Sequence, residues 1–256
     1  MNRDLSSYSD DEFILALTKH AKSLISPAHL TTDGPRKAVL LGGQSGAGKT
    51  TLHGIFQEKL DGNAIVINGD EFRKSHPNFT LLQAKYGKES VSHTAPWSGQ
   101  MTEALIDKLS KLGYNLIIEG TLRTSEVPLR TATLLRERGY EVSLALMAVK
   151  PDISLLSCQI RFEEMRIAGT TPRATDPKHH GQIVRGIVEN LKTLEESGAF
   201  DQVYLYTRSE ECLYPTEGAT ASAVLQNHLF GAWSEEELAH RRHLEQRLNM
   251  LKGSAS

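Results

Sequence analysis

The amino-acid sequence predicts an α/β fold in which helices flank a parallel β-sheet, with additional helices at the carboxyl end. Several short apolar runs with strand-like composition alternate with longer segments whose apolar residues recur at helical spacing. This alternation indicates right-handed crossovers between parallel strands. A glycine-rich G-x-x-x-x-G-K-[ST] sequence also follows the first apolar run, where a strand-to-helix turn would face a phosphate group.

The chain is predicted to begin with a helix. Ser9 and Glu12 have the spacing of a capping box, and the apolar residues of DDEFILALTKHAKSLI recur at helical intervals. The helix should end before Pro27, because the following SPAHLTTDGPR has the proline, glycine and threonine content of a loop. We therefore assign residues 1–34 to a leading helix and loop, within one domain that spans residues 1–256.

The remaining elements are predicted in alternation. The strand-like runs are, in order, KAVLLGG, NAIVING, YNLIIEG, YEVSLALMAV and DQVYLYT. Helical periodicity is found between them in TTLHGIFQEKL, PWSGQMTEALIDKLSKLG, VPLRTATLLRERG and PDISLLSCQIRFEEMRIAG. The second and third of these helices end in Gly113 and Gly139, a residue type that commonly ends helices. Further helices are predicted in TASAVLQNHLFGAW and SEEELAHRRHLEQRLNMLKG, and residues 253–256 are predicted to form a flexible tail.

The composition predicts a cytoplasmic protein without a nucleic-acid or membrane partner. The chain has 256 residues, of which 39% are apolar, and this is enough for a full hydrophobic core. A net charge of −2 provides no general basic field that would attract nucleic acid or anionic lipid. The amino terminus lacks the apolar core of a signal peptide, and no apolar run approaches the roughly 20 residues that span a bilayer. Two cysteines, Cys158 and Cys212, are too few for a disulfide framework, which fits a reducing compartment.

The segment GQSGAGKTT predicts a nucleoside triphosphate site. Its glycines permit a tight turn that lies close to the phosphates. Lys49 would neutralise the β- and γ-phosphate oxygens, and the Thr50 hydroxyl would ligate Mg²⁺. The predicted nucleotide-binding residues are Gly43, Gln44, Ser45, Gly46, Ala47, Gly48, Lys49, Thr50 and Thr51. The loop does not identify the phosphate acceptor, because switch proteins, motors, ATPases and small-molecule kinases share it.

Two carboxylates follow strand-like runs, where ligands of open α/β sheets bind. Glu119 comes after YNLII and fits the position of an acid that orients magnesium. Asp70 comes after AIVING and would then be available to accept the proton of a substrate hydroxyl, as phosphoryl transfer requires. Aspartate is also a favoured helix N-cap, and Arg73 is a candidate ion-pair partner. The roles of Asp70 as base, cap and ion-pair partner therefore stay open at this point.

Arginines are a third candidate element of the site. Arg161 is placed late in a predicted helix and Arg173 in the loop that follows. A guanidinium group offers fixed donors to the charge that spreads over a transferring phosphoryl group. The alternative is that both are surface arginines with Glu163 or Glu164 as neighbours. Glu103 lies off the apolar stripe of its helix and faces either solvent or a cleft.

Several motifs occur together in the order typical of one protein family. They are LLGGQSGAGKTT, NGDEFRKSHP, YNLIIEGTLRT with VP two residues later, and RAT followed by PK. With these motifs the chain resembles the zeta-type bacterial toxins, and within them the Pez toxins, from about Tyr8 to near the carboxyl end. The resemblance implies a P-loop kinase-like fold. It also implies an ATP-dependent kinase that phosphorylates the 3′-hydroxyl of UDP-N-acetylglucosamine and inhibits peptidoglycan synthesis.

The resemblance assigns roles to individual residues. It makes Asp70 the base that faces the sugar hydroxyl, and it makes Arg161 and Arg173 the γ-phosphate arginines. Lys49 and Thr50 keep their phosphate and magnesium roles. The positions that match the amino-sugar nucleotide pocket are Glu103, Glu119, Arg123 and Thr131, together with Asp70. The family also implies a separate antitoxin protein that obstructs the nucleotide site and holds the toxin inactive.

The chain departs from the family pattern near Arg173. RATDPKHH contains an extra Asp176, and the segment 166–173 is shorter than usual, which affects the placement of Arg173 but not its residue type. Two other functions are compatible with the phosphate loop. One is a different small-molecule phosphotransferase on the same scaffold, such as an antibiotic kinase. The other is a nucleotide-dependent binding protein that signals through a partner.

Overall fold

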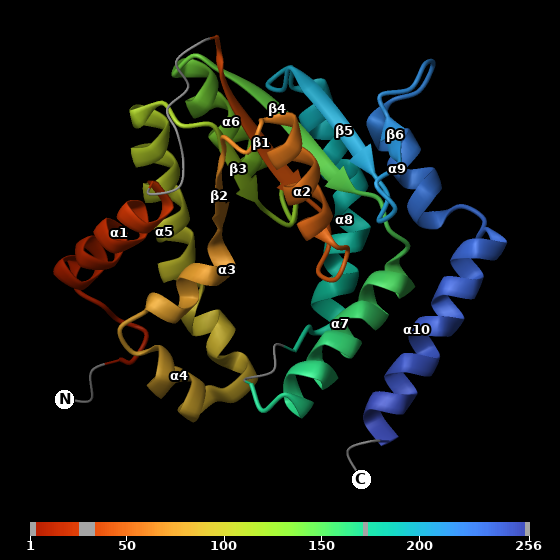
Figure 1. Ribbon diagram of the computed structural model, residues 1–256, viewed down its shortest axis with the longest axis horizontal. Helices are drawn as coiled ribbons and strands as arrows, with labels where there is room; N and C mark the ends of the chain where they lie inside the picture. The colour runs from red at the N-terminus through yellow and green to blue at the C-terminus, as the bar shows by residue number, and fades with distance from the viewer. Residues whose placement is uncertain (1–3, 26–33, 171–173, 254–256) are drawn as a thin grey trace.

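The fold is a mostly parallel six-stranded sheet with helices on both faces. The computed structural model describes residues 4–25, 34–170 and 174–253, and Figure 1 shows the arrangement of its elements. The strand order is β2-β3-β1-β4-β5-β6. The parallel strands are β1 (Arg36–Gly42), β2 (Ile65–Asn68), β3 (Leu116–Glu119), β4 (Tyr140–Met147) and β5 (Gln202–Tyr206). The short edge strand β6 (Cys212–Tyr214) runs antiparallel to β5.

The helices occupy the segments between the strands and the carboxyl end. The first ones are α1 (Asp10–Ile25), α2 (Lys49–Lys59), α3 (Gly69–Phe72), α4 (Phe79–Tyr86), α5 (Ser90–Leu112) and α6 (Glu126–Glu137). The later ones are α7 (Pro151–Ile167), α8 (Pro177–Glu196), α9 (Ala221–Phe230) and α10 (Glu235–Gly253). Short 3₁₀ turns at Arg73–Ser75 and Gly87–Glu89 flank α4. The predicted α/β alternation is therefore confirmed.

Several elements differ from the prediction, and one of them is α4, which lies outside the predicted helical segments. Strand β6 is not among the predicted strands, because three residues are too few to show a period. Helix α8 is not predicted either, although Asp176 caps it by accepting from the Lys178 N–H and its buried face includes Ile187 and Leu191. Helix α5 begins at Ser90 rather than at Pro96, and Pro96 is accommodated on its exposed side.

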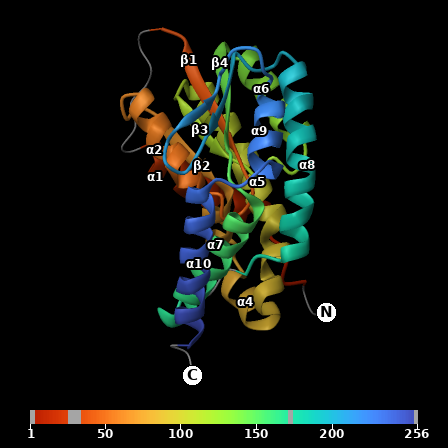
Figure 2. The same cartoon turned by 90° about the vertical axis from the view of Figure 1, so that its right-hand side faces the viewer.

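The sheet separates two hydrophobic layers. Along β1 successive side chains alternate between them, with Leu40 on one face and Leu41 on the other. One layer contains buried side chains from α1, α5, α6, α8 and α9, and the other contains those from α2, α7 and α10. Figure 2 shows the strands with α2 and α10 on one side and α8 and α9 on the other. Each fully buried leucine contributes about 1.5–3 kcal/mol to this packing.

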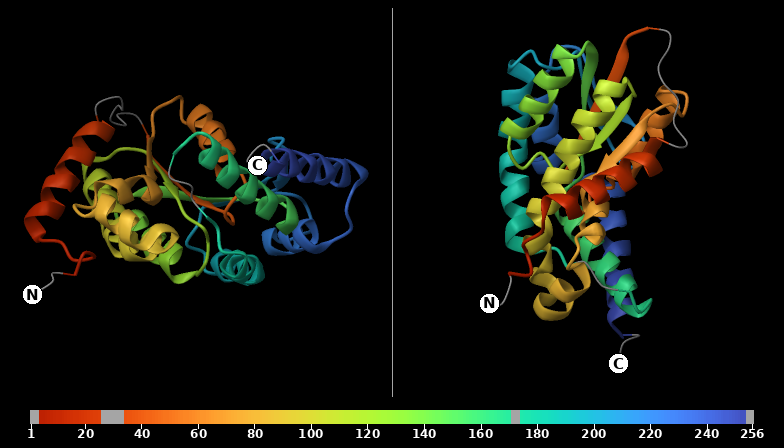
Figure 3. Two further views of the ribbon diagram at one scale, coloured as in Figure 1. Left: turned by 90° about the horizontal axis from the view of Figure 1, so that it is seen from below. Right: turned by 90° about the vertical axis from the view of Figure 1, so that its left-hand side faces the viewer.

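Helix α1 is attached to the sheet by an aromatic cluster. Its capping box forms as predicted, since the Ser9 N–H donates to Glu12 Oε2 at 2.8 Å and the Glu12 N–H donates to Ser9 Oγ at 3.3 Å. Phe13 is buried with its ring centroid 5.3 Å from that of Trp97 on α5. The helix packs against α5 beside the edge strand β2 (Figure 3, right). None of the described helices is long and apolar enough to cross a bilayer.

The strand register places three chain segments at one edge of the sheet. In the parallel ladders Asn68 of β2 and Leu41 of β1 both pair with Glu119 of β3. The segments that leave these strand ends are the phosphate loop after β1, the short α3 after β2 and the loop before α6. Residues from these three segments therefore converge on one crevice, as the rule for open α/β sheets predicts.

Candidate functional site

The phosphate loop has the backbone path of an anion-binding turn. Gly43, Gly46 and Gly48 have φ values of 139°, 76° and 91°, a region that glycine adopts without steric cost. Gly46 is also required for close approach, because a Cβ there would lie 2.1 Å from the Ser154 carbonyl oxygen of α7. The loop leads directly into α2, so the positive amino end of that helix adds to the site.

A buried polar network supports the loop from below. Gln44 is fully buried, and its Nε2 donates to the Val149 carbonyl at 2.7 Å and to Ser154 Oγ at 3.3 Å. Ser154 Oγ also lies 2.9 Å from His180 Nε2 on α8. Burial lowers the pKa of His180, and a backbone hydrogen bond at Ser45 partly opposes that shift. The network thus ties the loop to the end of β4, to α7 and to α8.

Lys49 lies at the centre of the site. Its Nζ donates to the Gly43 carbonyl at 3.1 Å and lies 3.7 Å from Glu119 Oε1. Burial lowers the pKa of Lys49, and the charges of Glu119 and Asp70 oppose that shift while Arg161 adds to it. The carboxylates from α3 and β3 and the arginine from α7 therefore all influence the pKa of the lysine that would bind the phosphates.

The residues around Lys49 form a cavity of about 260 Å³. It is lined by Gly46, Gly48, Lys49, Thr50, Glu119, Ser157, Arg161 and Arg208. Three cationic side chains and one carboxylate face this space, which favours a polyanionic ligand. The Thr50 hydroxyl and the Glu119 carboxylate are hard oxygen donors of the kind that Mg²⁺ prefers. The donor set is therefore suited to a magnesium–nucleotide complex.

Asp70 is held at the edge of the site by an arginine. Its Oδ1 accepts from Arg73 Nε at 2.9 Å, and the same guanidinium donates to the Val91 carbonyl at 2.8 Å. The N-cap of α3 is Asn68, whose side chain accepts from the Asp70 N–H at 3.0 Å. The capping role considered for Asp70 thus belongs to Asn68, whereas the ion pair with Arg73 forms. At 58% exposure the Asp70 carboxylate stays accessible to a substrate.

The predicted acceptor-side residues come from α5, α6 and the loop between β3 and α6. Glu103 forms an exposed ion pair with Arg130, with a Glu103 Oε1 to Arg130 Nη2 distance of 2.6 Å. Thr131 donates its hydroxyl to the Val127 carbonyl one helical turn earlier. The loop that carries Arg123 is held by α8, because Asn190 Nδ2 donates to the carbonyls of Leu122 at 3.0 Å and Arg123 at 2.9 Å.

Of the two predicted arginines, Arg161 lies within the described residues and Arg173 does not. Arg161 extends from α7 into the cavity of Lys49, while the neighbouring Glu163 and Glu164 pair with Arg166 and Arg247 instead. Arg173 lies outside the described residues, so its role stays a prediction.

Arg208 was not among the predicted site residues, although it follows the last parallel strand and lines the cavity. The rule that drew attention to Asp70 and Glu119, a polar residue after a strand-like run, also applies to Arg208.

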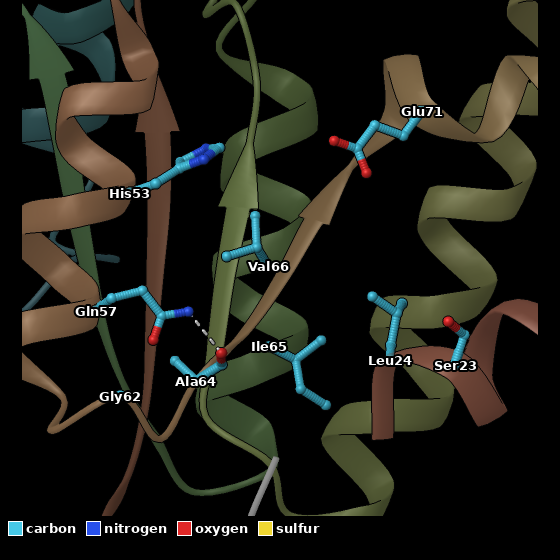
Figure 4. A pocket seen from close by; sticks show the side chains of 9 residues that line it. All are labelled: Ser23, Leu24, His53, Gln57, Gly62, Ala64, Ile65, Val66 and Glu71. Carbon is cyan, nitrogen blue, oxygen red and sulfur yellow. Dashed lines mark hydrogen bonds between the residues drawn. The ribbon is translucent and has the colours of Figure 1, made fainter. Parts of the chain in front are cut away.

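A second and larger cavity of about 500 Å³ lies away from the phosphate loop. It is bordered by α1, α2, β2 and α3 and is lined by Ser23, Leu24, His53, Gln57, Gly62, Ala64, Ile65, Val66 and Glu71 (Figure 4). Gln57 Nε2 donates to the Ala64 carbonyl across it at 2.8 Å. His53 connects the two cavities, since its Nε2 lies 3.1 Å from Glu119 Oε2 without hydrogen-bond geometry. The chemistry-bearing residues converge on the smaller cavity.

Comparisons with known proteins identify the family of this chain. The family model for Zeta toxin matches residues 25–219. Toxin PezT of Streptococcus pneumoniae serotype 4 is 46% identical over 256 residues, which cover 97% of this chain and 98% of that protein. Toxin zeta of Streptococcus pyogenes is 41% identical over 212 residues, which cover 82% of this chain and 73% of that protein.

Solved structures give the same relationship. A chain from the characterisation of the PezAT chromosomal toxin-antitoxin system of Streptococcus pneumoniae has a TM-score of 0.89 and 45% identity, covering 97% of this chain and 99% of its own. A chain of the native AvrRxo1-ORF1:-ORF2 complex has a TM-score of 0.58 at 14% identity, covering 97% and 90% of the two chains, and this shows similarity of fold alone. The predicted P-loop kinase-like fold is confirmed, and the chain belongs to the zeta toxin family.

Proposed function

We propose that this chain is an ATP-dependent kinase that phosphorylates the 3′-hydroxyl of UDP-N-acetylglucosamine. In this proposal it acts in the cytoplasm as the toxin of a toxin-antitoxin pair and inhibits peptidoglycan synthesis. The observation that carries the proposal is the convergence of Lys49, Glu119, Arg161 and Asp70 at the carboxyl edge of the sheet. A phosphate-binding lysine beside an accessible carboxylate is the minimum that phosphoryl transfer to a hydroxyl requires.

The residues divide the reaction between them. The substrate hydroxyl oxygen attacks the γ-phosphorus, the bond from that phosphorus to the ADP oxygen breaks, and the hydroxyl proton passes to Asp70. The ion pair with Arg73 orients the Asp70 carboxylate for this step. Lys49 and Arg161 neutralise the charge that develops on the transferring group. A bound Mg²⁺, held by Thr50 with Glu119, would screen the phosphate oxygens.

The acceptor and the partner are assigned on the strength of the family. Glu103, Arg123 and Thr131 are the residues we assign to the amino-sugar nucleotide. The relatives named as toxins, and the PezAT toxin-antitoxin system among the similar structures, support a cognate antitoxin protein as partner. In this assignment the antitoxin would keep nucleotide from the site until it is removed.

The test is a phosphorylation assay with a matched pair of variants. Purified chain is incubated with ATP, Mg²⁺ and UDP-N-acetylglucosamine, and phosphorus NMR is used to detect a new sugar phosphate monoester. Asp70→Asn should lower kcat by about 10² to 10⁴-fold while ATP still binds, because only the proton acceptor is lost. Glu71→Gln removes the adjacent exposed acid and should keep the wild-type rate.

Four results would contradict parts of the proposal. Absence of a new phosphate monoester with the wild-type chain would exclude this acceptor, and consumption of ATP with another hydroxyl compound would indicate a different small-molecule kinase. A wild-type rate from Asp70→Asn would remove Asp70 from the role of base. Toxicity on expression that survives Asp70→Asn would favour a nucleotide-dependent binding protein instead.

A further inference from the structure

Arg208 lies on a well-defined turn between β5 and β6. The turn is closed by the Thr207 N–H, which donates to the Glu211 carbonyl at 3.0 Å. The Thr207 side chain reinforces it, because its Oγ1 lies 2.9 Å from Ser209 Oγ and accepts from the Glu211 N–H at 3.2 Å. Arg208 therefore extends from a rigid position at the same sheet edge as the phosphate loop.

The Arg208 side chain reaches across the sheet edge to the phosphate loop. Its Nε donates to the Ala47 carbonyl at 3.2 Å, and its Nη2 donates to the Gly46 carbonyl and, at 3.0 Å, to Ser157 Oγ on α7. A Cβ on Gly48 would lie 3.5 Å from Arg208 Nε, so the guanidinium also covers the start of α2. Because Arg208 holds these carbonyls on the outer side of the loop, the backbone N–H groups of the loop are oriented to bind an anion.

The charge of Arg208 is not compensated within the described residues. The hydrogen-bond acceptors that surround it are two carbonyls and a hydroxyl, and the described ion pairs give it no carboxylate. Burial lowers the pKa of Arg208, and its charge in turn contributes to the lowered pKa of His240 on α10. A desolvated guanidinium without an anion is costly, and an incoming phosphate would remove that cost.

We propose that Arg208 is a further nucleotide-binding residue: it braces the outer carbonyls of the phosphate loop and presents its uncompensated charge to the phosphates of the nucleotide. This inference rests on the nucleotide site of the proposed function. It goes beyond that site because it adds a ligand-binding residue from the β5–β6 turn to the cavity that Arg161 of α7 also lines. The site would then hold the phosphates between two arginines and Lys49.

The experiment measures ADP binding to the full chain by calorimetry at several salt concentrations. Arg208→Gln should weaken ADP binding by about tenfold or more, since one charge-assisted contact is worth at least that much. It should also reduce the slope of affinity against salt, because one fewer phosphate charge is neutralised. Arg208→Lys keeps the charge and should restore the salt slope while recovering only part of the affinity.

Two control variants separate this inference from a structural role and from the proposed function. Arg242→Gln removes an exposed arginine of α10. Arg242 lies about 200° around the helix from His240, the α10 residue whose pKa Arg208 affects, so this variant should bind ADP like the wild type. Arg208→Gln binding within about twofold of the wild type, or weakened binding with an unchanged salt slope, would overturn the inference. Lys49→Ala should abolish binding. A wild-type chain that binds no ADP would overturn the nucleotide site as a whole, whereas loss with Lys49→Ala but not with Arg208→Gln would overturn Arg208 alone.

Discussion

At the scale of single residues, the site depends on how closely the phosphate loop approaches α7. Gly46 lies so near the Ser154 carbonyl and Cys158 Sγ that a Cβ would be 2.1 Å and 2.7 Å from them. Its positive φ of 76° adds a second constraint. The loop conformation is thus determined both by its own glycines and by the helix that packs beneath it.

Gly46→Ala is therefore expected to be strongly disruptive. The clash with a backbone oxygen cannot be relieved by a side-chain rotation, so we expect a loss of about 2 kcal/mol or more of unfolding free energy together with loss of ADP binding. Gly54→Ala is the matched control, because Gly54 lies inside α2 with no atom within 4 Å of its Cβ position. That variant should be stabilised by about 0.5–1 kcal/mol. Urea unfolding and calorimetry would measure both, and an undisturbed Gly46→Ala protein would refute the close approach.

At the scale of elements, α1 contributes one large buried aromatic side chain, Phe13, to the core. Phe13 is buried against Trp97, and Tyr8 lies with its ring centroid 4.8 Å from that of Trp97. The neighbouring Leu15 is 73% exposed and contributes little to this contact. Phe13 is thus the largest side chain that α1 buries in the core.

Phe13→Ala should lower the unfolding free energy by about 3–5 kcal/mol, because it removes a large buried ring and leaves a cavity. Leu15→Ala is the control and should change it by less than about 0.5 kcal/mol. Chemical denaturation of the two variants checks the difference. Hydrogen exchange should show increased exchange in α1 for Phe13→Ala alone; equal effects from the two variants would contradict this account of the docking.

At the scale of the whole molecule, buried histidines make stability depend on pH. Burial lowers the pKa of His76, His180 and His228 below the ordinary value of 6.5. As pH falls through that value, the unfolded chain takes up protons that the folded chain does not, so the unfolding free energy decreases. Carboxylates with lowered pKa, such as Asp107 and Asp201, lose their contribution only at lower pH.

The chain should therefore be less stable at about pH 5.5 than at about pH 7.5. His180→Gln should make that dependence shallower, whatever its effect on absolute stability, because one of the protonation differences is removed. The neighbouring exposed His179→Gln should leave the dependence unchanged. Unfolding free energies from urea titrations at the two pH values test this. Equal pH dependences in the wild type and both variants would show that His180 does not contribute to the pH dependence of stability.

Local patterns were enough to predict much of this molecule. The apolar runs predicted every parallel strand, the capping box predicted the start of α1, and the glycine-rich motif predicted the phosphate loop. Asp70 and Glu119 were selected by their positions after strands. Each of these features is determined by interactions between residues that are close in the chain, so a short stretch of sequence is enough to predict it.

Tertiary structure decided the contacts between distant segments. The pairing of Glu103 with Arg130 and the approach of Arg208 to the phosphate loop both depend on backbone direction and register. Arg208 and Ala47 are far apart in the chain, and only the closing of the sheet brings them together. The sequence by itself determined the family and the nucleotide motif. The fold decided which charges surround that motif, because such interactions depend on distances in space that sequence spacing does not specify.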